Sequence, residues 1–111
     1  MKNKEIKVIK KDSSKFGGRL VAIVDNEEVG FLRYHAESEK VVNISIVEVK
    51  YNYEVDEIVR KLIVELKKLE FKMIICRSVM NEIIMSILGD EGILVEKTEI
   101  ANIEKTIVIQ Q

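Results

Sequence analysis

The sequence predicts an α+β domain in which two main helices pack on a mixed, largely antiparallel β-sheet. β-Branched and aromatic stretches fill the first half of the 111-residue chain. One long segment in the middle then places apolar residues at helical spacing, and the rest of the chain alternates between strand-like and helix-like segments. The predicted order of elements is β-β-β-β-α-β-α-β-β.

Four strands are expected in the first half, at 5–9, 19–24, 28–36 and 41–49. The segment Asp25-Asn26-Glu27 is a polar connection of hairpin length. The fourth segment has apolar residues on both faces, which is typical of a central strand.

The second half begins with the clearest helix, over 55–69, where apolar and charged residues occupy opposite faces. A short buried strand is expected at 71–76. Ser78 is the expected N-cap of a second helix over 79–88, which Gly89 would end. Two closing strands are expected at 93–97 and 105–109.

Composition indicates one domain over residues 1–111, with 47% hydrophobic residues and a formal net charge of −1. That charge favours neither a nucleic acid nor a membrane surface as a partner. The single cysteine, Cys76, fits a reducing compartment, and no segment is apolar enough to span a bilayer, so a cytoplasmic location is expected. No spacing of histidine, cysteine or carboxylates indicates a metal site.

The join between the fourth strand and the long helix resembles the GNAT N-acetyltransferase superfamily, especially its compact single-domain members. The family pattern there is V-x-P-x-Y-R-x-K-G-I-G-x-x-L, and it is matched in register by Val49, Tyr53, Ile58 and Leu62. The stretch 28–31, with its V-G pair, and the pair at 92–93 resemble two further family segments.

The resemblance implies a site for acetyl-CoA between the fourth strand and the helix. The positions that would contact it, through backbone groups, are Val47, Val49, Val55, Glu57, Ile58 and Val59. A small-molecule or peptide amine would be the acetyl acceptor, and a homodimer is left open.

The same resemblance breaks at the residues that do the chemistry. Glu57 and Val59 replace the two glycines, and Glu54 and Asp56 stand where arginine and lysine are usual. A carboxylate within about 4 Å of a phosphate charge costs about 1 kcal/mol in water and about 4 kcal/mol at an effective dielectric of 20. The helix dipole returns only about 0.3 to 1 kcal/mol. The acidic residues are otherwise favourable charges at a helix start, or contacts for a cationic partner.

Two residues are catalytic candidates. Glu48 is expected on the strand face that carries Val42, Ile44 and Ile46, where a carboxylate can act as a general base toward an amine. The alternative is an exposed or locally paired acid at the strand end. Cys76 is either a nucleophile or acyl carrier, or a small buried packing residue.

Other chemistry-bearing residues have weaker roles. The tyrosine that often serves the family as catalytic acid maps to Leu88, which has no proton to give. His35 is expected to be an ordinary strand residue. Three tyrosines either line a pocket or pack locally, Tyr34, Tyr51 and Tyr53, and the last two flank the strand-to-helix join. Methionines 73, 80 and 85 are expected to fill the core.

Three functions follow from these features. The first is an acetyl-CoA-dependent N-acetyltransferase with unusual loop chemistry. The second is a relative that has lost catalysis and serves as a binding or regulatory module. The third is a small oligomerising protein without a cofactor.

Overall fold

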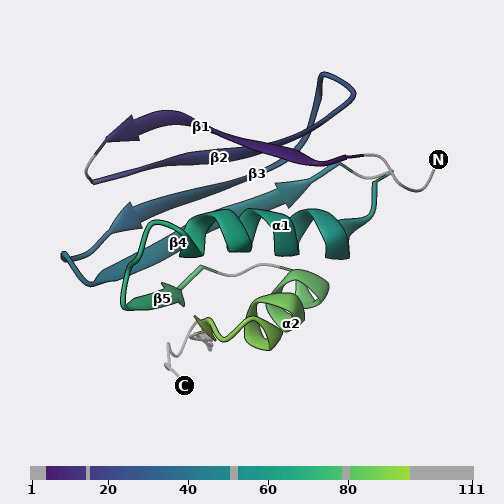
Figure 1. The fold of residues 1–111 in the computed structure, drawn as a ribbon. Helices are drawn as coiled ribbons and strands as arrows, with labels where there is room; N and C mark the ends of the chain where they lie inside the picture. Colours follow the sequence, from purple (N-terminus) through teal and green to yellow (C-terminus); the bar gives the residue numbers. More distant parts are fainter. Residues whose placement is uncertain (1–4, 15, 51–52, 79–80, 96–111) are drawn as a thin grey trace, which may run out of the picture.

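The computed structural model describes residues 5–14, 16–50, 53–78 and 81–95 (Figure 1). Within these residues it contains six strands and two helices. Their bounds are β1 Lys7–Ser14, β2 Gly17–Val24, β3 Glu27–Ala36, β4 Val41–Val49, α1 Val55–Lys67, β5 Met73–Cys76, α2 Glu82–Asp90 and β6 Leu94–Val95.

The strands form one sheet in the order β1-β2-β3-β4-β5-β6. The pairs among β1 to β4 are antiparallel, whereas β5 runs parallel to β4 and β6 runs parallel to β5. This topology confirms the predicted mixed, largely antiparallel sheet with two helices.

The two residues of the turn between β2 and β3 determine the geometry of this hairpin. Asp25 and Asn26 connect β2 to β3 and have φ values of 52° and 66°. Two successive residues with positive φ make the mirror-image turn that matches strand twist, and aspartate and asparagine tolerate that conformation well. The predicted hairpin is therefore confirmed.

The three antiparallel pairs each carry a register shift, in β1 between Lys11 and Ser14, and the shifts in β3 and β4 change which side chains face the helices. β3 carries an extra residue, Val29, relative to β2, and β4 carries an extra residue, Ser45, relative to β3. A bulge moves every later side chain to the opposite face. Val42 and Ile44 are buried before the bulge in β4, and Val47 is buried after it.

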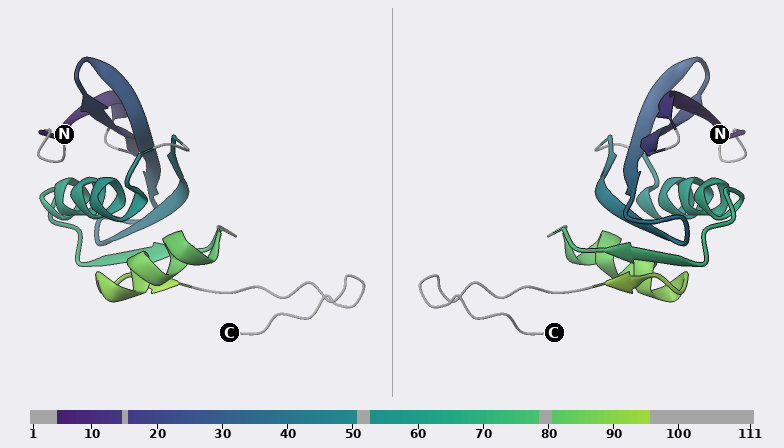
Figure 2. Two further views of the ribbon diagram at one scale, coloured as in Figure 1. Left: turned by 90° about the vertical axis from the view of Figure 1, so that its right-hand side faces the viewer. Right: turned by 90° about the vertical axis from the view of Figure 1, so that its left-hand side faces the viewer.

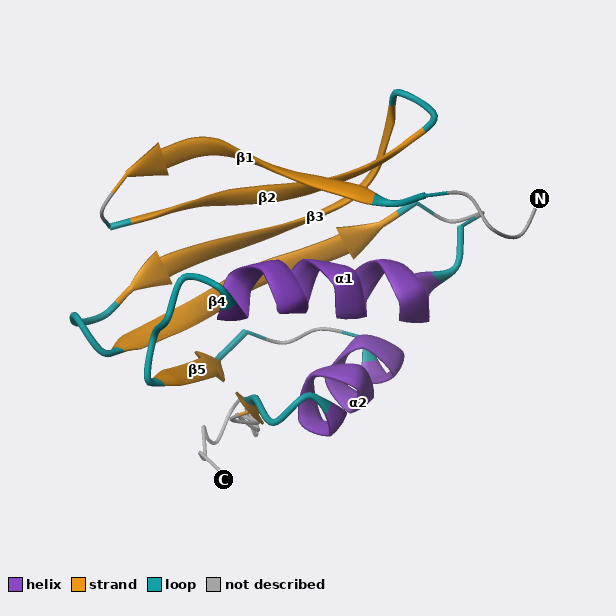
Figure 3. Ribbon diagram, in the orientation of Figure 1, coloured by secondary structure: helices purple, strands orange, loops and turns teal. Residues whose placement is uncertain are grey.

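Both helices cover the same face of the sheet (Figures 2 and 3). α1 packs across β1 to β4, while α2 packs against α1 and β6. The buried stripe of α1 contains Ile58, Val59, Leu62, Ile63 and Leu66. Burying each such side chain contributes about 1.5 to 3 kcal/mol, so the amphipathic pattern decides which face α1 turns to the sheet. No helix in the described residues is long and apolar enough to span a membrane.

The limits of α2 differ from the prediction. Asn81, and not Ser78, is the N-cap, because its side chain accepts a hydrogen bond from the Ile84 N–H at 2.8 Å. Gly89 lies inside the helix. The helix ends at Asp90, and Gly92, whose φ is +85°, then reverses the chain so that the Ile93 N–H donates to the Leu88 carbonyl at 3.0 Å.

The first predicted strand and the closing strands also shift. β1 extends to Ser14, because Ser14 pairs with Gly17 across a tight turn. β6 lies within the predicted segment 93–97, and the predicted strand 105–109 lies outside the described residues.

The outer face of the sheet, which no described helix covers, carries ion pairs that cross strands. Lys11 on β1 contacts Glu28 on β3 at 2.7 Å, and this diagonal passes over Val21 on β2. Val21 has no exposed surface despite lying on this face. Glu37 and Arg77 form a second pair. Charged side chains with long stems thus close much of this face.

Gly30 allows α1 to approach the sheet. A Cβ added at Gly30 would lie 2.9 Å from the Glu48 carbonyl oxygen and 3.1 Å from Cγ2 of Ile58. We expect Gly30→Ala to lower the free energy of unfolding by about 1 to 3 kcal/mol, as overpacking does. Urea denaturation measures this change.

The matched control is Gly89→Ala. A Cβ at Gly89 would meet no atom within 4 Å, and Gly89 is helical. We expect this variant to gain about 0.5 to 1 kcal/mol. Equal stability of the two variants would contradict the close approach at Gly30.

Candidate functional site

β4 continues past the point where β5 ends. The two strands pair from Val41 opposite Met73 to Ile44 opposite Cys76, and β4 then runs on to Val49. The remaining half of β4 has no strand beside it on the β5 side among the described residues. A strand edge of this kind presents unpaired N–H and C=O groups.

Asn43 fixes the position where the strands part. It is the one buried polar residue in the described core, with 6% of its surface exposed. Its Oδ1 accepts a hydrogen bond from the Arg77 N–H at 3.1 Å, directly after the last β4–β5 pair. The side chain thereby satisfies a backbone donor that a longer β5 would have bonded to β4. A single asparagine within the β-branched run of β4 was the sequence signal for this role, and the prediction missed it.

Backbone direction can be read from β4 itself. The Lys50 N–H donates to the Val29 carbonyl of β3 at 2.8 Å. Because successive residues in a strand point to opposite sides, the backbone groups of Val49 and Val47 point away from β3, to the open edge. On that side β4 has no partner strand among the described residues beyond Ile44. Both residues were predicted to contact the cofactor through backbone groups, and this direction fits that role.

The end of β4 is tied to the β2–β3 turn. Glu27 contacts Lys50 Nζ at 2.7 Å and accepts a hydrogen bond from the Tyr53 hydroxyl at 2.9 Å. The hydrogen bond that Lys50 donates to Glu27 raises the pKa of Lys50. Tyr53 therefore serves as a local anchor that sets where α1 begins, and Tyr51 lies outside the described residues.

The start of α1 leaves few backbone donors. The Ile58 N–H already donates to the Glu54 carbonyl at 3.2 Å, and Val59 lies deeper in the helix. From Ile58, the fourth residue of α1, the helix uses its own N–H donors, so the cofactor contacts predicted for Ile58 and Val59 stay a prediction that these N–H groups do not support. Their side chains are 2% and 0% exposed. Val55 and Glu57, in the first turn, keep N–H groups without an acceptor in the helix.

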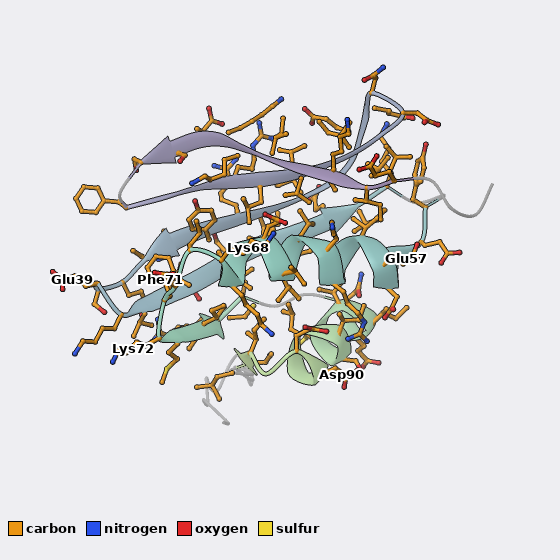
Figure 4. The ribbon with its side chains drawn as sticks, viewed as in Figure 1. Glu39, Glu57, Lys68, Phe71, Lys72 and Asp90 are labelled. Carbon is orange, nitrogen blue, oxygen red and sulfur yellow. The ribbon has the colours of Figure 1, made fainter. Side chains whose placement is uncertain are left out.

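Three carboxylates lie at the start of α1, and one of them, that of Asp56, accepts side-chain hydrogen bonds. Asp56 receives hydrogen bonds from Arg60 Nε at 3.1 Å to each carboxylate oxygen. Glu54 makes no side-chain cap, and both Glu54 and Glu57 are exposed, with Glu57 projecting to solvent in Figure 4. Two of the three carboxylates thus remain near the helix start without such a partner.

Arg60 joins the two helices. Besides Asp56 it contacts Asp90 at 3.2 Å and Glu91 at 2.7 Å, at the end of α2. The carboxylates that surround Arg60 raise its pKa, and the bond from Arg60 lowers the pKa of Glu91. The arginine serves this helix contact and is turned away from the sheet.

Glu48 lies on a different face from the one predicted. The bulge at Ser45 places Glu48 on the outer face, opposite Phe31, while Val42 and Ile44 face the helices. The prediction that all of these share a face is wrong because an extra residue reverses the alternation. Glu48 is exposed and has no ion pair or side-chain hydrogen bond with a described residue.

Cys76 has no exposed surface and belongs to the core. Burial raises the pKa of its thiol, and Sγ donates to the Ser78 carbonyl at 3.7 Å. A buried thiol that stays protonated is a poor nucleophile, so its placement favours the packing role.

The remaining candidates do not gather at the β4 edge. Leu88 is fully buried, His35 is exposed on the outer face, and Tyr34 lies in the core, where burial raises its pKa. Met73 is 48% exposed and is not core filler. The described part of the chain contains no group of three or more residues able to hold a metal ion.

A hollow of about 420 Å³ lies on the outer face beside Glu48. Its lining comes from the start of β3 and the end of β4: Glu28, Gly30, Phe31, Glu48, Val49 and Lys50. Sequence patterns did not predict it, because cross-strand pairing brings Phe31 opposite Glu48.

Removing the Asn43 amide tests the parting of the strands. We expect Asn43→Ala to lower the free energy of unfolding by about 1 to 3 kcal/mol, because the Arg77 N–H loses its acceptor in a buried setting. Ser45→Ala, the neighbouring control, removes only the bond from Ser45 Oγ to the Arg33 carbonyl at 3.3 Å. We expect this control to stay within about 0.5 kcal/mol of wild type in urea denaturation. Equal losses in both variants would contradict the role of Asn43.

Known structures resemble this fold at low sequence identity. A GNAT-family acetyltransferase from Streptococcus pneumoniae TIGR4 superposes with a TM-score of 0.64 at 13% identity, over 96% of this chain and 98% of that one. A ribosomal-protein-alanine N-acetyltransferase from Brucella melitensis biovar Abortus 2308 gives 0.62 at 15% identity, over 89% and 74% of the two chains. An aminoglycoside N-acetyltransferase in complex with CoA gives 0.58 at 15% identity, over 89% and 69%. No protein-family model and no curated protein matches the sequence. The resemblance seen in the sequence is thus confirmed at the level of structure: this chain has the GNAT fold.

Proposed function

We propose that this protein binds an acyl-CoA along the open edge of β4 and transfers the acyl group to an amine. The observation that carries the proposal is the parting of β4 and β5 in a GNAT fold. It leaves the half of β4 that contains Val47 and Val49 without a partner strand on the β5 side among the described residues. A fold alone does not establish a function, so the proposal depends on this site and its chemistry.

The edge fits the pantetheine arm of coenzyme A. That arm is an extended chain with two amide groups, and an extended chain of amides can add to a strand edge as a further strand does. Val47 and Val49 offer backbone donors and acceptors on one side of β4. Their side chains point into the core, with Val47 4% exposed, so no side chain has to move to admit the ligand.

The start of α1 fits the phosphates less well. N–H groups of the first turn attract anions, which is worth about 0.3 to 1 kcal/mol. Glu54 and Glu57 oppose this with about 1 kcal/mol each if a phosphate comes within about 4 Å in water. Arg60 offsets the third carboxylate, on Asp56. We infer that the nucleotide end contributes little and that the pantetheine arm contributes most of the affinity.

An acyl-CoA supplies a thioester, whose acyl carbon bonds to the amine nitrogen while the carbon–sulfur bond breaks and its electron pair leaves with sulfur. Glu48 is the carboxylate on the described part of β4 that can accept the proton released by the amine. It extends from the same half of β4 and borders the hollow on the outer face. Amine deprotonation by a positioned carboxylate is ordinary general-base catalysis.

A binding module without turnover is the second candidate. Two residues favour it. Leu88 stands where the resemblance implies a catalytic tyrosine and has no proton to donate, and the Cys76 thiol is buried, which raises its pKa. The two candidates share the acyl-CoA site and differ in product formation alone.

Titration with acetyl-CoA and with acetyl-pantetheine tests the shared site. We expect both to bind, and we expect Glu57→Gln to tighten acetyl-CoA binding by about fivefold, which is about 1 kcal/mol, through loss of repulsion. Acetyl-pantetheine carries no phosphate, so its affinity should not change. Isothermal titration calorimetry at moderate salt measures both ligands.

Glu39→Gln is the matched control. Glu39 is exposed in the β3–β4 turn at the opposite end of the molecule (Figure 4). It changes the net charge by the same amount, and both affinities should stay at the wild-type value. If neither acetyl-CoA nor acetyl-pantetheine binds at millimolar concentration, the proposal is wrong. If both ligands bind, formation of an N-acetyl product separates the enzyme from the binding module.

A further inference from the structure

On the outer face of the sheet, the part formed by β3 and β4 contains two charges that take part in no ion pair with a described residue. Lys11 pairs with Glu28, and Glu37 pairs with Arg77. Neither Arg33 nor Glu48 has an ion pair or a side-chain hydrogen bond with any described residue. Both side chains are exposed on this face.

These two charges have opposite sign and lie on neighbouring strands. Glu48 on β4 stands directly opposite Phe31 on β3, and Arg33 is two residues farther along β3, opposite Ile46. Arg33 and Glu48 are therefore diagonal neighbours, whose Cβ atoms are typically about 7 to 8 Å apart. Their side chains can span that distance, but they form no ion pair in the structure.

Arg33 also stands directly opposite another cation. Its partner on β2 is Arg19, and like charges in this position destabilise a sheet. The Arg19 guanidinium lies 5.5 Å from the centroid of the Phe31 ring and contacts Asp12 at 3.6 Å, but its Nε is buried without a hydrogen-bond partner among the described residues. An oxyanion between the two guanidinium groups would relieve this repulsion and supply acceptors.

At the Glu48 end of the Arg33–Glu48 diagonal lies the hollow that Glu48 lines. Its volume of about 420 Å³ lies within the range of small-ligand sites. Within it the Glu28 carboxylate is paired with Lys11 and the Phe31 ring lies 5.5 Å from the Arg19 guanidinium, so Glu48 is the lining carboxylate that has no ion pair with a described residue and can hold an ammonium group. Val49, which also lines the hollow, belongs to the open edge of β4.

We propose that this face binds a small amine that also carries an oxyanion, with its ammonium group at Glu48 and its carboxylate or phosphate at Arg33 and Arg19. The proposal rests on the proposed function, for which it names the class of acyl acceptor. The site lies one strand from the open edge, so a molecule held at both ends presents its amine beside the half of β4 that contains Val47 and Val49. An amine without an anionic group would make no ion pair with Arg33.

The test measures binding of small probes by isothermal titration calorimetry without an acyl donor. The main probe is γ-aminobutyrate, with n-butylamine and butyrate as probes that each keep one of its charges. We expect γ-aminobutyrate to bind about tenfold more tightly than either, because two charge-assisted contacts form in place of one. The phosphate arm of the test is 2-aminoethyl phosphate, and tighter binding of one probe identifies the preferred oxyanion.

Variants assign each end. Arg33→Gln should abolish the advantage of γ-aminobutyrate over n-butylamine, and Glu48→Gln should abolish its advantage over butyrate. Lys61→Gln is the matched control on the exposed face of α1 and should bind as wild type does. The proposal is overturned if γ-aminobutyrate and 2-aminoethyl phosphate bind no better than the probes with a single charge. It is also overturned if Arg33→Gln and Glu48→Gln bind them unchanged.

The two proposals fail separately in these measurements. Probe binding without acetyl-CoA binding supports the acceptor-type site and removes the transfer function. Acetyl-CoA binding without any preference for the doubly charged probes keeps the transfer function and removes this acceptor class.

Discussion

The parting of β4 and β5 is the feature on which the rest of the site depends. A central strand normally has partners on both sides, because unpaired backbone groups in a sheet interior cost free energy. Here β5 stops at Cys76, and the Asn43 side chain takes over its next donor. The strand that continues has to expose its edge. That edge has no partner strand among the described residues, and an edge of this kind suits a ligand with amide groups.

The bulge at Ser45 gives the two sides of β4 different tasks. Before it, β4 pairs on both sides and turns Val42 and Ile44 to the helices. After it, the strand keeps β3 alone, turns Val47 inward and turns Glu48 outward. One extra residue therefore separates a backbone edge from a carboxylate on the other face. In a regular strand Glu48 would have pointed into the core, where an unpaired carboxylate is very costly.

The sequence was sufficient for most of the fold because the patterns that define it are local. The period of the apolar residues identified α1, and the β-branched run identified β4 to the residue. It was insufficient where a choice depends on partners distant in sequence. Asn81 and Gly92 limit α2 through backbone geometry that competes with the equally suitable Ser78 and Gly89.

The site was less predictable for the same reason. Val47 and Val49 were expected from the resemblance, and their backbone direction agrees with it. Glu48 was assigned to the wrong face, because a bulge depends on the neighbouring strand and leaves no mark on alternation within β4. The diagonal of Arg33 and Glu48, and the opposition of Arg33 and Arg19, exist only after the register of three strands is known.

Amide hydrogen exchange, followed residue by residue along β4 in the free protein, tests the central claim most directly. The N–H groups of Val42 and Ile44 lie on the side of β4 that pairs with β5, and that of Glu48 lies on the side that pairs with β3, so all three should be protected. Those of Val47 and Val49 should exchange much faster, although their side chains pack inward, and acetyl-pantetheine should slow them selectively. Protection of Val47 and Val49 equal to that of Val42 and Ile44 in the free protein would show that the edge is already paired, and would contradict the account.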